Sequence, residues 1–236
     1  MGKPKAVLEW QNEEEGTIRF LEEEVSAPTV RFFVTGEEEA EFRLQDIVFP
    51  EESEKNVEIY KKITSEMIKC ISEAFLLLWN EGFEEVVLVE QRNSKIAEIL
   101  DSTDVVHKIY SEYMMKRKSE MQKSTGSGGQ QLRLVEEENG FICENEAKTF
   151  FCRLLPYSAQ EPEERSFYLY EVEVEEKKRN RGIATECLTE LFRILAADGP
   201  VTLYLQVGSY NEPAVHLYEK LGFEISEELC YYAAKE

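Results

Sequence analysis

The sequence lacks the features that would place the protein in a membrane or around a structural metal. No apolar run approaches the roughly 18 residues that a membrane-spanning helix needs, and the N-terminus lacks the apolar segment of a signal peptide. The five cysteines are odd in number and form no C-x-x-C pair, so we expect neither a disulfide framework nor a zinc site. We therefore expect a cytoplasmic protein without a metal and without a membrane partner.

Positive charge is also scarce. The 236 residues include 27 Lys and Arg against 48 Asp and Glu, which gives a net charge of −21. The imbalance is spread along the chain, because residues 132–236 alone hold 11 basic and 21 acidic side chains. We expect no nucleic-acid partner, since binding phosphates requires a basic patch. An acidic surface favours a cationic substrate such as an amine, although solubility alone would also account for it.

One stretch, Val174-Glu-Glu-Lys-Lys-Arg-Asn-Arg-Gly-Ile-Ala-Thr185, departs from this acidic background. Before it, Arg165–Glu175 is rich in aromatic residues and valine and predicts a strand. After it, Thr185–Ala197 has apolar residues at helical spacing and predicts a helix, which Asp198-Gly199-Pro200 ends. Arg179–Ala184 is therefore expected to be a basic turn between a strand and a helix.

Such a turn is suited to binding an anion. Backbone N–H groups at the start of a helix lack internal partners, and the helix dipole adds partial positive charge there. Gly182 lets an anion approach the backbone closely. The turn thus predicts a phosphate site, but it has neither the Gly-Lys-Ser/Thr ending of a Walker P-loop nor the three glycines of a dinucleotide fingerprint. The alternative interpretation is a solvated cationic loop.

Two motifs resemble the signatures of the GNAT N-acetyltransferase superfamily. Arg179-x-x-Gly182-x-Ala184 is similar to the arginine/glutamine-x-x-glycine-x-glycine/alanine signature. Downstream, Asn211-Glu-Pro-Ala-Val-His-Leu-Tyr-Glu-Lys-Leu-Gly-Phe223 resembles the second signature, in which an asparagine opens a helix and a tyrosine and Leu-Gly-Phe follow. The resemblance covers Leu132–Glu236. It departs from the family at Glu176, where a proline is frequent, and in lacking two amphipathic helices that often form the acceptor wall.

The resemblance implies acetyl-coenzyme A as the co-substrate. Its pyrophosphate would lie at the start of the helix, and its pantetheine arm would pair between the strand before the turn and the predicted strand Val201–Val207, which splay apart in this family. Asn211 either bonds the pantetheine or only caps its helix. The residues implied in cofactor binding are Val172, Val174, Arg179, Asn180, Arg181, Gly182, Ile183, Ala184, Thr185 and Asn211.

Acyl transfer to an amine also requires proton transfers. Tyr218 is the candidate general acid for the departing thiolate, since a phenol has a pKa near ~10, above that of a thiol; the alternative is an ordinary half-buried tyrosine. Glu171, Glu173 and Glu175 alternate along the strand, so we expect all three on one face. Glu173, nearest the middle of the expected splay, is the candidate to accept a proton from the amine. The alternatives are attraction of a cationic substrate and a solvated face.

The two halves of the chain resemble each other. Asn93–Met114, which includes a predicted strand at Val105–Met114, aligns with Asn211–Tyr232 without a gap. A strand, a helix and a strand precede each segment; in the first half they are predicted at Ala40–Phe49, Val57–Asn80 and Glu85–Glu90. The second half is predicted to open with paired strands at Leu132–Glu138 and Glu146–Leu155. The alternative is that one βαβ segment resembles another by composition. The first half has the acidic or neutral Glu51–Val57 in place of the basic turn, and Leu100 in place of Tyr218. We therefore expect the N-terminal copy to be degenerate and to bind no coenzyme A.

The sequence thus predicts an α/β fold with mixed sheets, in tandem GNAT-like units of which the second carries the acyl-coenzyme A site. We expect a degenerate domain at 1–122, a Gly/Ser-rich linker at 123–131 and an acetyltransferase domain at 132–236. Such units can pack with pseudo-twofold symmetry, so the chain need not dimerise further, and Ala6–Met114 can complete the acceptor site. The expected function is acetyl transfer from acetyl-coenzyme A to a primary amine of a small acceptor that can be cationic. The alternative is a non-catalytic coenzyme A-binding or regulatory protein on the same scaffold.

Overall fold

The computed structural model describes residues 6–20, 29–50, 57–120, 131–157 and 165–235. These residues form two compact units. Unit 1 takes the described residues up to Ser111 and those from Leu229 onward, and unit 2 takes those from Glu112 to Glu228. The expected linker and the acidic segment Glu51–Val57 lie almost wholly outside the described residues. The division into sequence domains at 123–131 stays a prediction, whereas the compact units divide within two strands.

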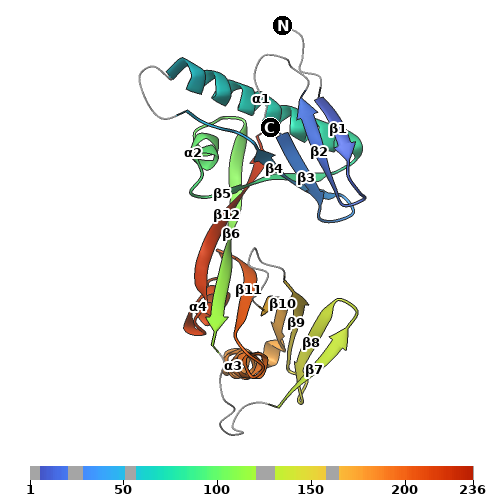
Figure 1. The fold of residues 1–236 in the computed structure, drawn as a ribbon, viewed down its shortest axis with the longest axis vertical. Coiled ribbons are helices and arrows are strands. Elements are labelled where there is room, and N and C mark those ends of the chain that lie inside the picture. Colours follow the sequence, from blue (N-terminus) through green and yellow to red (C-terminus); the bar gives the residue numbers. More distant parts are fainter. Residues whose placement is uncertain (1–5, 21–28, 51–56, 121–130, 158–164, 236) are drawn as a thin grey trace. The chain divides into compact units, whose positions relative to one another are not determined.

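The same order of elements occurs twice along the described chain (Figure 1): four strands, a helix, a strand, a helix and a last strand. The first half comprises β1 (Ala6–Trp10), β2 (Glu15–Phe20), β3 (Thr29–Val34), β4 (Glu39–Gln45), α1 (Val57–Glu81), β5 (Glu85–Gln91), α2 (Lys95–Asp101) and β6 (Val106–Ser119). The second half comprises β7 (Leu132–Glu137), β8 (Gly140–Asn145), β9 (Phe150–Pro156), β10 (Arg165–Val174), the short 3₁₀ helix η2 (Glu176–Lys178), α3 (Ile183–Ala196), β11 (Val201–Gly208), α4 (Glu212–Lys220) and β12 (Glu224–Ala234). The internal repeat is confirmed at the level of element order.

Strand pairing repeats as well. In each half, the first four strands form an antiparallel meander, β1 to β4 and β7 to β10. The fourth strand then pairs in parallel with the fifth, β4 with β5 and β10 with β11. A parallel pair needs a crossover connection, and α1 and α3 supply it. The mixed α/β sheet is the fold class that the sequence predicted.

The last strand of each half completes the sheet of the other unit. β6 comes from the first half and extends to Ser119, beyond its expected end at Met114; its residues from Glu112 onward pair antiparallel with the whole of β11 in unit 2. β12 comes from the second half, and its residues from Leu229 pair antiparallel with β5 in unit 1. Unit 1 is therefore built from two separate segments of the chain, and unit 2, although contiguous, combines residues from both halves.

Both exchanged strands bury side chains in the core that they join. Tyr232 of β12 is fully buried in unit 1, where its hydroxyl donates a hydrogen bond to Asp101 Oδ1 at 3.0 Å. Met115 of β6 is fully buried in unit 2. The Arg117 guanidinium of the same strand lies 4.2 Å from the ring centroid of Phe192 in α3, and burial lowers the pKa of Arg117. A fully buried methionine such as Met115 stabilises its unit by about 1.5–3 kcal/mol.

The strands that open the second half differ from the sequence expectation. We expected two strands, Leu132–Glu138 and Glu146–Leu155, but the structure has a third, β8, between them. A second turn follows β8, in which the Asn145 side chain accepts hydrogen bonds from the backbone N–H groups of Thr149 at 2.8 Å and Phe150 at 3.1 Å. The Asn145 side chain holds this turn, which contains neither glycine nor proline. The composition of the segment therefore gave no turn signal.

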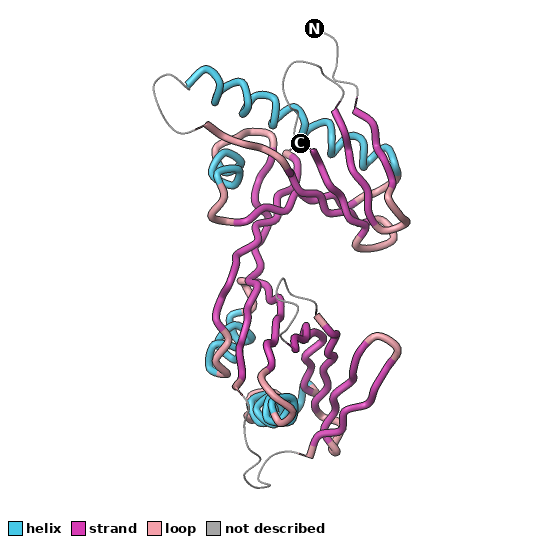
Figure 2. The backbone as a smooth tube through the Cα atoms, viewed as in Figure 1, coloured by secondary structure: helices cyan, strands magenta, loops and turns pink. Residues whose placement is uncertain are grey.

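One face of the sheet in unit 2 carries the helices. The buried cluster that joins α3 and α4 to the strands uses one set of alternating residues, among them Leu154, Leu169 and Leu203. No helix lies between β7 and β8, because Glu137 pairs with Gly140 across a tight turn (Figure 2). Side chains on the opposite face, such as Tyr168, remain partly exposed. No helix in the described part of the chain has the length and apolarity needed to cross a membrane.

The strand exchange predicts the outcome of cutting the chain between its halves. We expect a variant with a protease site inserted at residues 123–131 to elute, after cleavage, as one species containing both fragments in size-exclusion chromatography. A fragment starting at Gln131 should not fold alone, because it lacks β6 and leaves β11 with an unpaired edge and a cavity in place of Met115. Elution of two separate, folded fragments would contradict the exchange.

Candidate active site

The basic turn lies where the sequence predicted it, between β10 and α3. Within it Asn180 and Gly182 both have positive φ angles, 60° and 80°. Gly182 is the N-cap residue of α3 and is left-handed. This conformation costs ordinary residues about 1–2 kcal/mol, whereas glycine adopts it freely and asparagine tolerates it. The glycine is thus required by the backbone path that leads into the helix.

The backbone N–H groups in the first turn of α3 are not capped by a side chain. At α2 and α4 the first N–H groups are capped: Ser94 accepts from the backbone at 2.9 Å and Asn211 at 3.3 Å. Asn211 therefore caps its helix, as one of its two interpretations predicted. Gly182 has no side chain that could do the same for α3, and no side-chain cap is formed there. The N–H groups of Ile183, Ala184 and Thr185 can therefore meet an anion.

Arg179 closes the turn onto the strand before it. Its Nε donates a hydrogen bond to the Val174 carbonyl at 3.1 Å, which ties the end of β10 to the start of the turn. The Val174 carbonyl oxygen is thus already hydrogen-bonded. The Val174 N–H group is the part of this peptide that could donate to an acyl oxygen. The exposed side chains of Asn180 and Arg181 follow directly. The structure therefore places two arginines beside the uncapped start of α3.

The strands β10 and β11 part as expected. Their parallel pairing begins at Arg165 with Val201 and ends at Tyr168 with Tyr204. Beyond that rung no pair joins the rest of these two described strands, although β11 continues to pair with β6 on its other side. Val172 and Val174 lie on the free part of β10. An open strand edge of this kind can accept an extended chain.

A β-bulge lies in the segment of β10 that carries the candidate glutamates. Tyr170 pairs with Arg153 and Glu173 with Phe151, so the two residues between them on β10 face a single residue of β9. Glu171 occupies the bulge with a φ of 49°. The bulge interrupts the period-two alternation from which the one-face expectation was derived, so that expectation stays a prediction.

The bulge nevertheless separates the roles of these carboxylates. Glu171 forms an ion pair with Arg153 at 2.8 Å, and Arg153 also contacts Glu137 at 2.6 Å. Glu175 precedes η2, outside the strand. Glu173 is exposed and shares its rung with Phe151, on the face away from the helices. Glu173 therefore remains the candidate to accept a proton, whereas the Glu171 carboxylate is already ion-paired with Arg153.

Tyr218 lies deeper than expected. It is 8% exposed and its ring lies 5.7 Å from that of Phe223 in an edge-to-face contact. Burial, with a smaller contribution from the neighbouring Cys152, raises the pKa of Tyr218 to about 12. The hydroxyl is therefore protonated at neutral pH and can donate. His216, two residues earlier, is exposed on another face of α4.

Three thiols gather in the core beside Tyr218. Cys143 and Cys152 face each other across β8 and β9, and Cys187 lies on α3; all three are fully buried and free. A hydrogen bond with Cys143, followed by burial, raises the pKa of Cys152. The sequence could not reveal this cluster, because the register that joins Cys143 to Cys152 depends on β8. No group of three metal-binding side chains occurs among the described residues.

A comparison with protein families identifies unit 2. Residues 109–223 match the model of the Acetyltransferase (GNAT) family. These limits fall close to those of unit 2, Glu112–Glu228, so that the match includes most of β6 from the first half of the sequence. Unit 2 therefore carries a GNAT acetyltransferase domain.

Individual relatives agree with this assignment. The chain is 37% identical over 68 residues to a mycothiol acetyltransferase of Corynebacterium aurimucosum, a match that spans 29% of this chain and only 22% of that protein. A GCN5-related N-acetyltransferase from Sphaerobacter thermophilus has a similar fold, with a TM-score of 0.56 at 11% identity, covering 94% of this chain and 81% of that one. A GCN5-related N-acetyltransferase from Kribbella flavida gives 0.53 at 8% identity, over 91% and 90%. At such low sequence identities, the structural similarity shows the fold alone. The similarity extends over both halves of the chain.

The raised pKa of Tyr218 predicts a loss of stability at alkaline pH. The folded value, about 12, exceeds the ordinary value near ~10, so the contribution is complete below pH ~10 and is lost as the pH rises towards 12. In Tyr218→Phe, we expect the fall in unfolding free energy between pH 9 and 11 to be about 1 kcal/mol smaller than in the wild type. Urea denaturation at both pH values measures this difference. An identical pH dependence in the two proteins would contradict the assigned environment.

Proposed function

We propose that unit 2 transfers an acetyl group from acetyl-coenzyme A to a primary amine of a small acceptor. The observation that carries this proposal is the parting of β10 and β11 directly before the uncapped, basic start of α3. The free edge of β10 suits an extended pantetheine arm, and the N–H groups of residues 183–185 with Arg179 and Arg181 suit a pyrophosphate. The domain's GNAT family membership agrees with this chemistry.

Each residue has one task in this proposal. Acetyl-coenzyme A supplies the activated acyl group as a thioester. Val172 lies in the bulge, and Val174 pairs with β9 but lies beyond the last rung with β11, so that a backbone N–H group there can polarise the acyl oxygen. Glu173 accepts a proton from the amine, which must be neutral to attack. Tyr218 donates its proton to the departing sulfur.

A non-catalytic coenzyme A-binding protein is the alternative on the same scaffold. Release of free thiol from acetyl-coenzyme A, measured across a panel of primary amines, separates the two functions. The location in the cytoplasm and a monomeric state stay predictions.

Gly182 tests the phosphate site. Gly182→Glu should weaken coenzyme A binding about tenfold, because it sets a negative charge at the positive end of the helix dipole. A matched control exists at the other end of α3: Gly199 also has a positive φ, 131°, and a side chain at either position meets no closer neighbour than Glu186, 3.9 Å from a Cβ at 182. Gly199→Glu carries the same charge and a similar backbone strain, and should bind normally. Calorimetry with equal affinities for both variants would refute the site.

Tyr218 tests the chemistry. Tyr218→Phe removes the proton donor but keeps the buried ring, so we expect kcat to fall roughly a hundredfold while the affinity for coenzyme A changes little. Steady-state rates at saturating substrates and calorimetry measure the two effects. Unchanged kcat, with chemistry shown to be rate-limiting, would remove Tyr218 from the mechanism.

A further inference from the structure

Four tyrosines gather on the helix-free face of the sheet in unit 2, where β10 and β11 part. Tyr168 and Tyr204 form the last paired rung of these strands. The ring of Tyr157 lies 4.8 Å from that of Tyr204 and 6.1 Å from that of Tyr168, and the ring of Tyr170 lies 6.4 Å from that of Tyr168. All four remain partly or largely exposed. We call this group the tyrosine patch.

A carboxylate borders the tyrosine patch at the open end of the splay. Glu112 of β6 pairs with Gly208 at the end of β11 and accepts a hydrogen bond from the Gln206 side chain. Gln206 lies two residues beyond Tyr204, on the same face of β11. The Glu112 charge acts on the patch, because after burial it is the next cause that raises the pKa of Tyr168.

Basic side chains on this face lie towards the closed end of the splay or are held by other carboxylates. Lys116 and Lys118 pair with Tyr204 and Thr202, towards the closed end of the splay. Arg153 is held between Glu137 and Glu171. The side of the patch that faces the parted strands is thus bordered by Glu112, with Glu173 further along β10.

We propose that the tyrosine patch and Glu112 bind a second positive charge of the acceptor, so that the preferred acceptor is a small diamine. This inference rests on the proposed acetyl transfer, because Glu173 would receive the proton of the attacking amine. A cation over tyrosine rings is attracted by their quadrupole, and a nearby carboxylate adds a charged hydrogen bond. The neutral end of the diamine then points along the free edge of β10.

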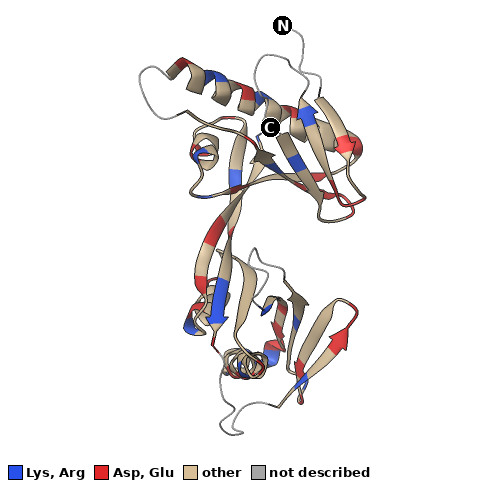
Figure 3. Cartoon of the chain, viewed as in Figure 1, with Lys and Arg blue, Asp and Glu red and all other residues tan. Residues whose placement is uncertain are grey.

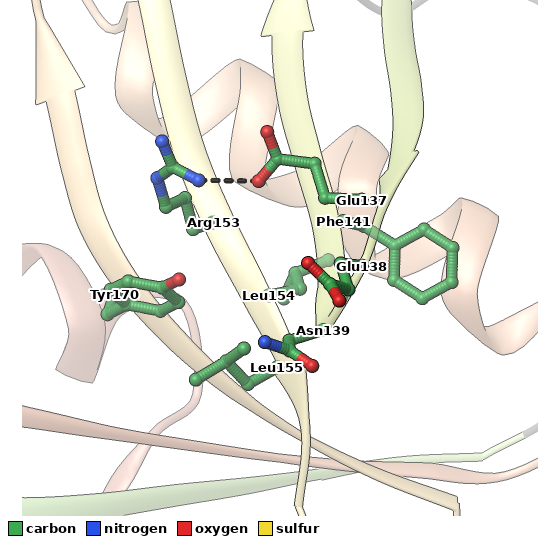
Figure 4. Close-up of a pocket in the computed structure, with 9 residues that line it drawn as sticks. Glu137, Glu138, Asn139, Phe141, Arg153, Leu154, Leu155 and Tyr170 are labelled. Atoms are coloured by element: carbon green, nitrogen blue, oxygen red, sulfur yellow. Dashed lines mark hydrogen bonds and ion pairs between the residues drawn. The ribbon is translucent and has the colours of Figure 1, made fainter.

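A hollow beside the patch gives the acceptor room. It has a volume of about 530 Å³, and Tyr170, Arg153 and Leu155 line it together with the turn between β7 and β8 (Figure 4). Tyr170 belongs both to the hollow and to the tyrosine patch. A short turn joins β7 to β8, with Glu137 paired to Gly140, so this connection has no helix that would cover the hollow.

Three primary amines of equal length test the proposal: 1,4-diaminobutane, 4-aminobutan-1-ol and 4-aminobutanoate, which end in a positive, a neutral and a negative group. We expect kcat/KM to fall in that order for the wild type. Glu112→Gln and Tyr168→Leu should reduce the preference of diaminobutane over aminobutanol by about three- to thirtyfold, the range of a cation–π or exposed charge contact. Tyr168→Phe keeps the aromatic face and should retain the preference.

Glu219→Gln is the control for the net charge. It removes one carboxylate from an exposed position on α4, away from the patch, and should leave the preference unchanged. If it lowers the preference as much as Glu112→Gln does, long-range attraction by the acidic protein accounts for the selectivity and the proposal fails. Circular dichroism and thermal unfolding confirm that each variant is folded.

Calorimetric titration with 1,4-diaminobutane, without acetyl-coenzyme A, separates this inference from the proposed function. Binding that weakens in Glu112→Gln and Tyr168→Leu, in a protein that releases no thiol, would support the diamine site and overturn the acetyl transfer. Thiol release with equal kcat/KM for the diamine and the amino alcohol would support the acetyl transfer and overturn the diamine site. Absence of both binding and preference would overturn the diamine site as well.

Discussion

The pairing of β6 with β11 is the interaction on which the active unit depends. β11 has two edges: one is filled along its whole length by β6, and the other pairs with β10 for only four residues before the strands part. The open edge is therefore confined to one place, because β6 prevents the opposite edge from being exposed as well. The same strand brings Met115 into the core and Glu112 to the open end. Since β6 belongs to the first half of the sequence, the first half contributes directly to the unit that holds the acetyltransferase motifs.

The bulge in β10 has a comparable effect on a smaller scale. A regular strand continuing from the buried Leu169 would turn Glu173 towards the helices, where an unpaired carboxylate would be costly to bury. With one extra residue at Glu171, the alternation shifts, Val174 packs towards the core and Glu173 stays exposed. The parting of the strands and the bulge thus occur within six residues, so that the proposed acyl-binding backbone and the proposed proton acceptor come from one short segment.

Much of this could be predicted from the sequence. Strand and helix periodicity located α1, β5, β10, α3 and β11 to within a few residues, and the glycine and arginine spacing of residues 179–184 located the turn. Periodicity could not predict the tertiary arrangement. The exchange of β6 and β12 depends on which strand edges are free after folding, and local sequence preference does not determine this. The bulge at Glu171 and the pairing of Cys143 with Cys152 depend on register, which a one-residue shift changes without altering composition. Glu112 was missed for the same reason, since it lies outside both motifs.

A chain with a net charge of −21 must still attract an anion if it binds coenzyme A. Acidic side chains lie over both units (Figure 3), yet most are more than a screening length of about 8 Å from any one point at physiological salt. What an anion meets at α3 is local: the uncapped N–H groups, the helix dipole, and Arg179 and Arg181. The helix-free face has the opposite character, with Glu112 beside the tyrosine patch. The two partners of the proposed reaction therefore meet opposite local fields on either side of the splay, and this separation lets one small unit hold an anionic carrier and a cationic acceptor at the same time.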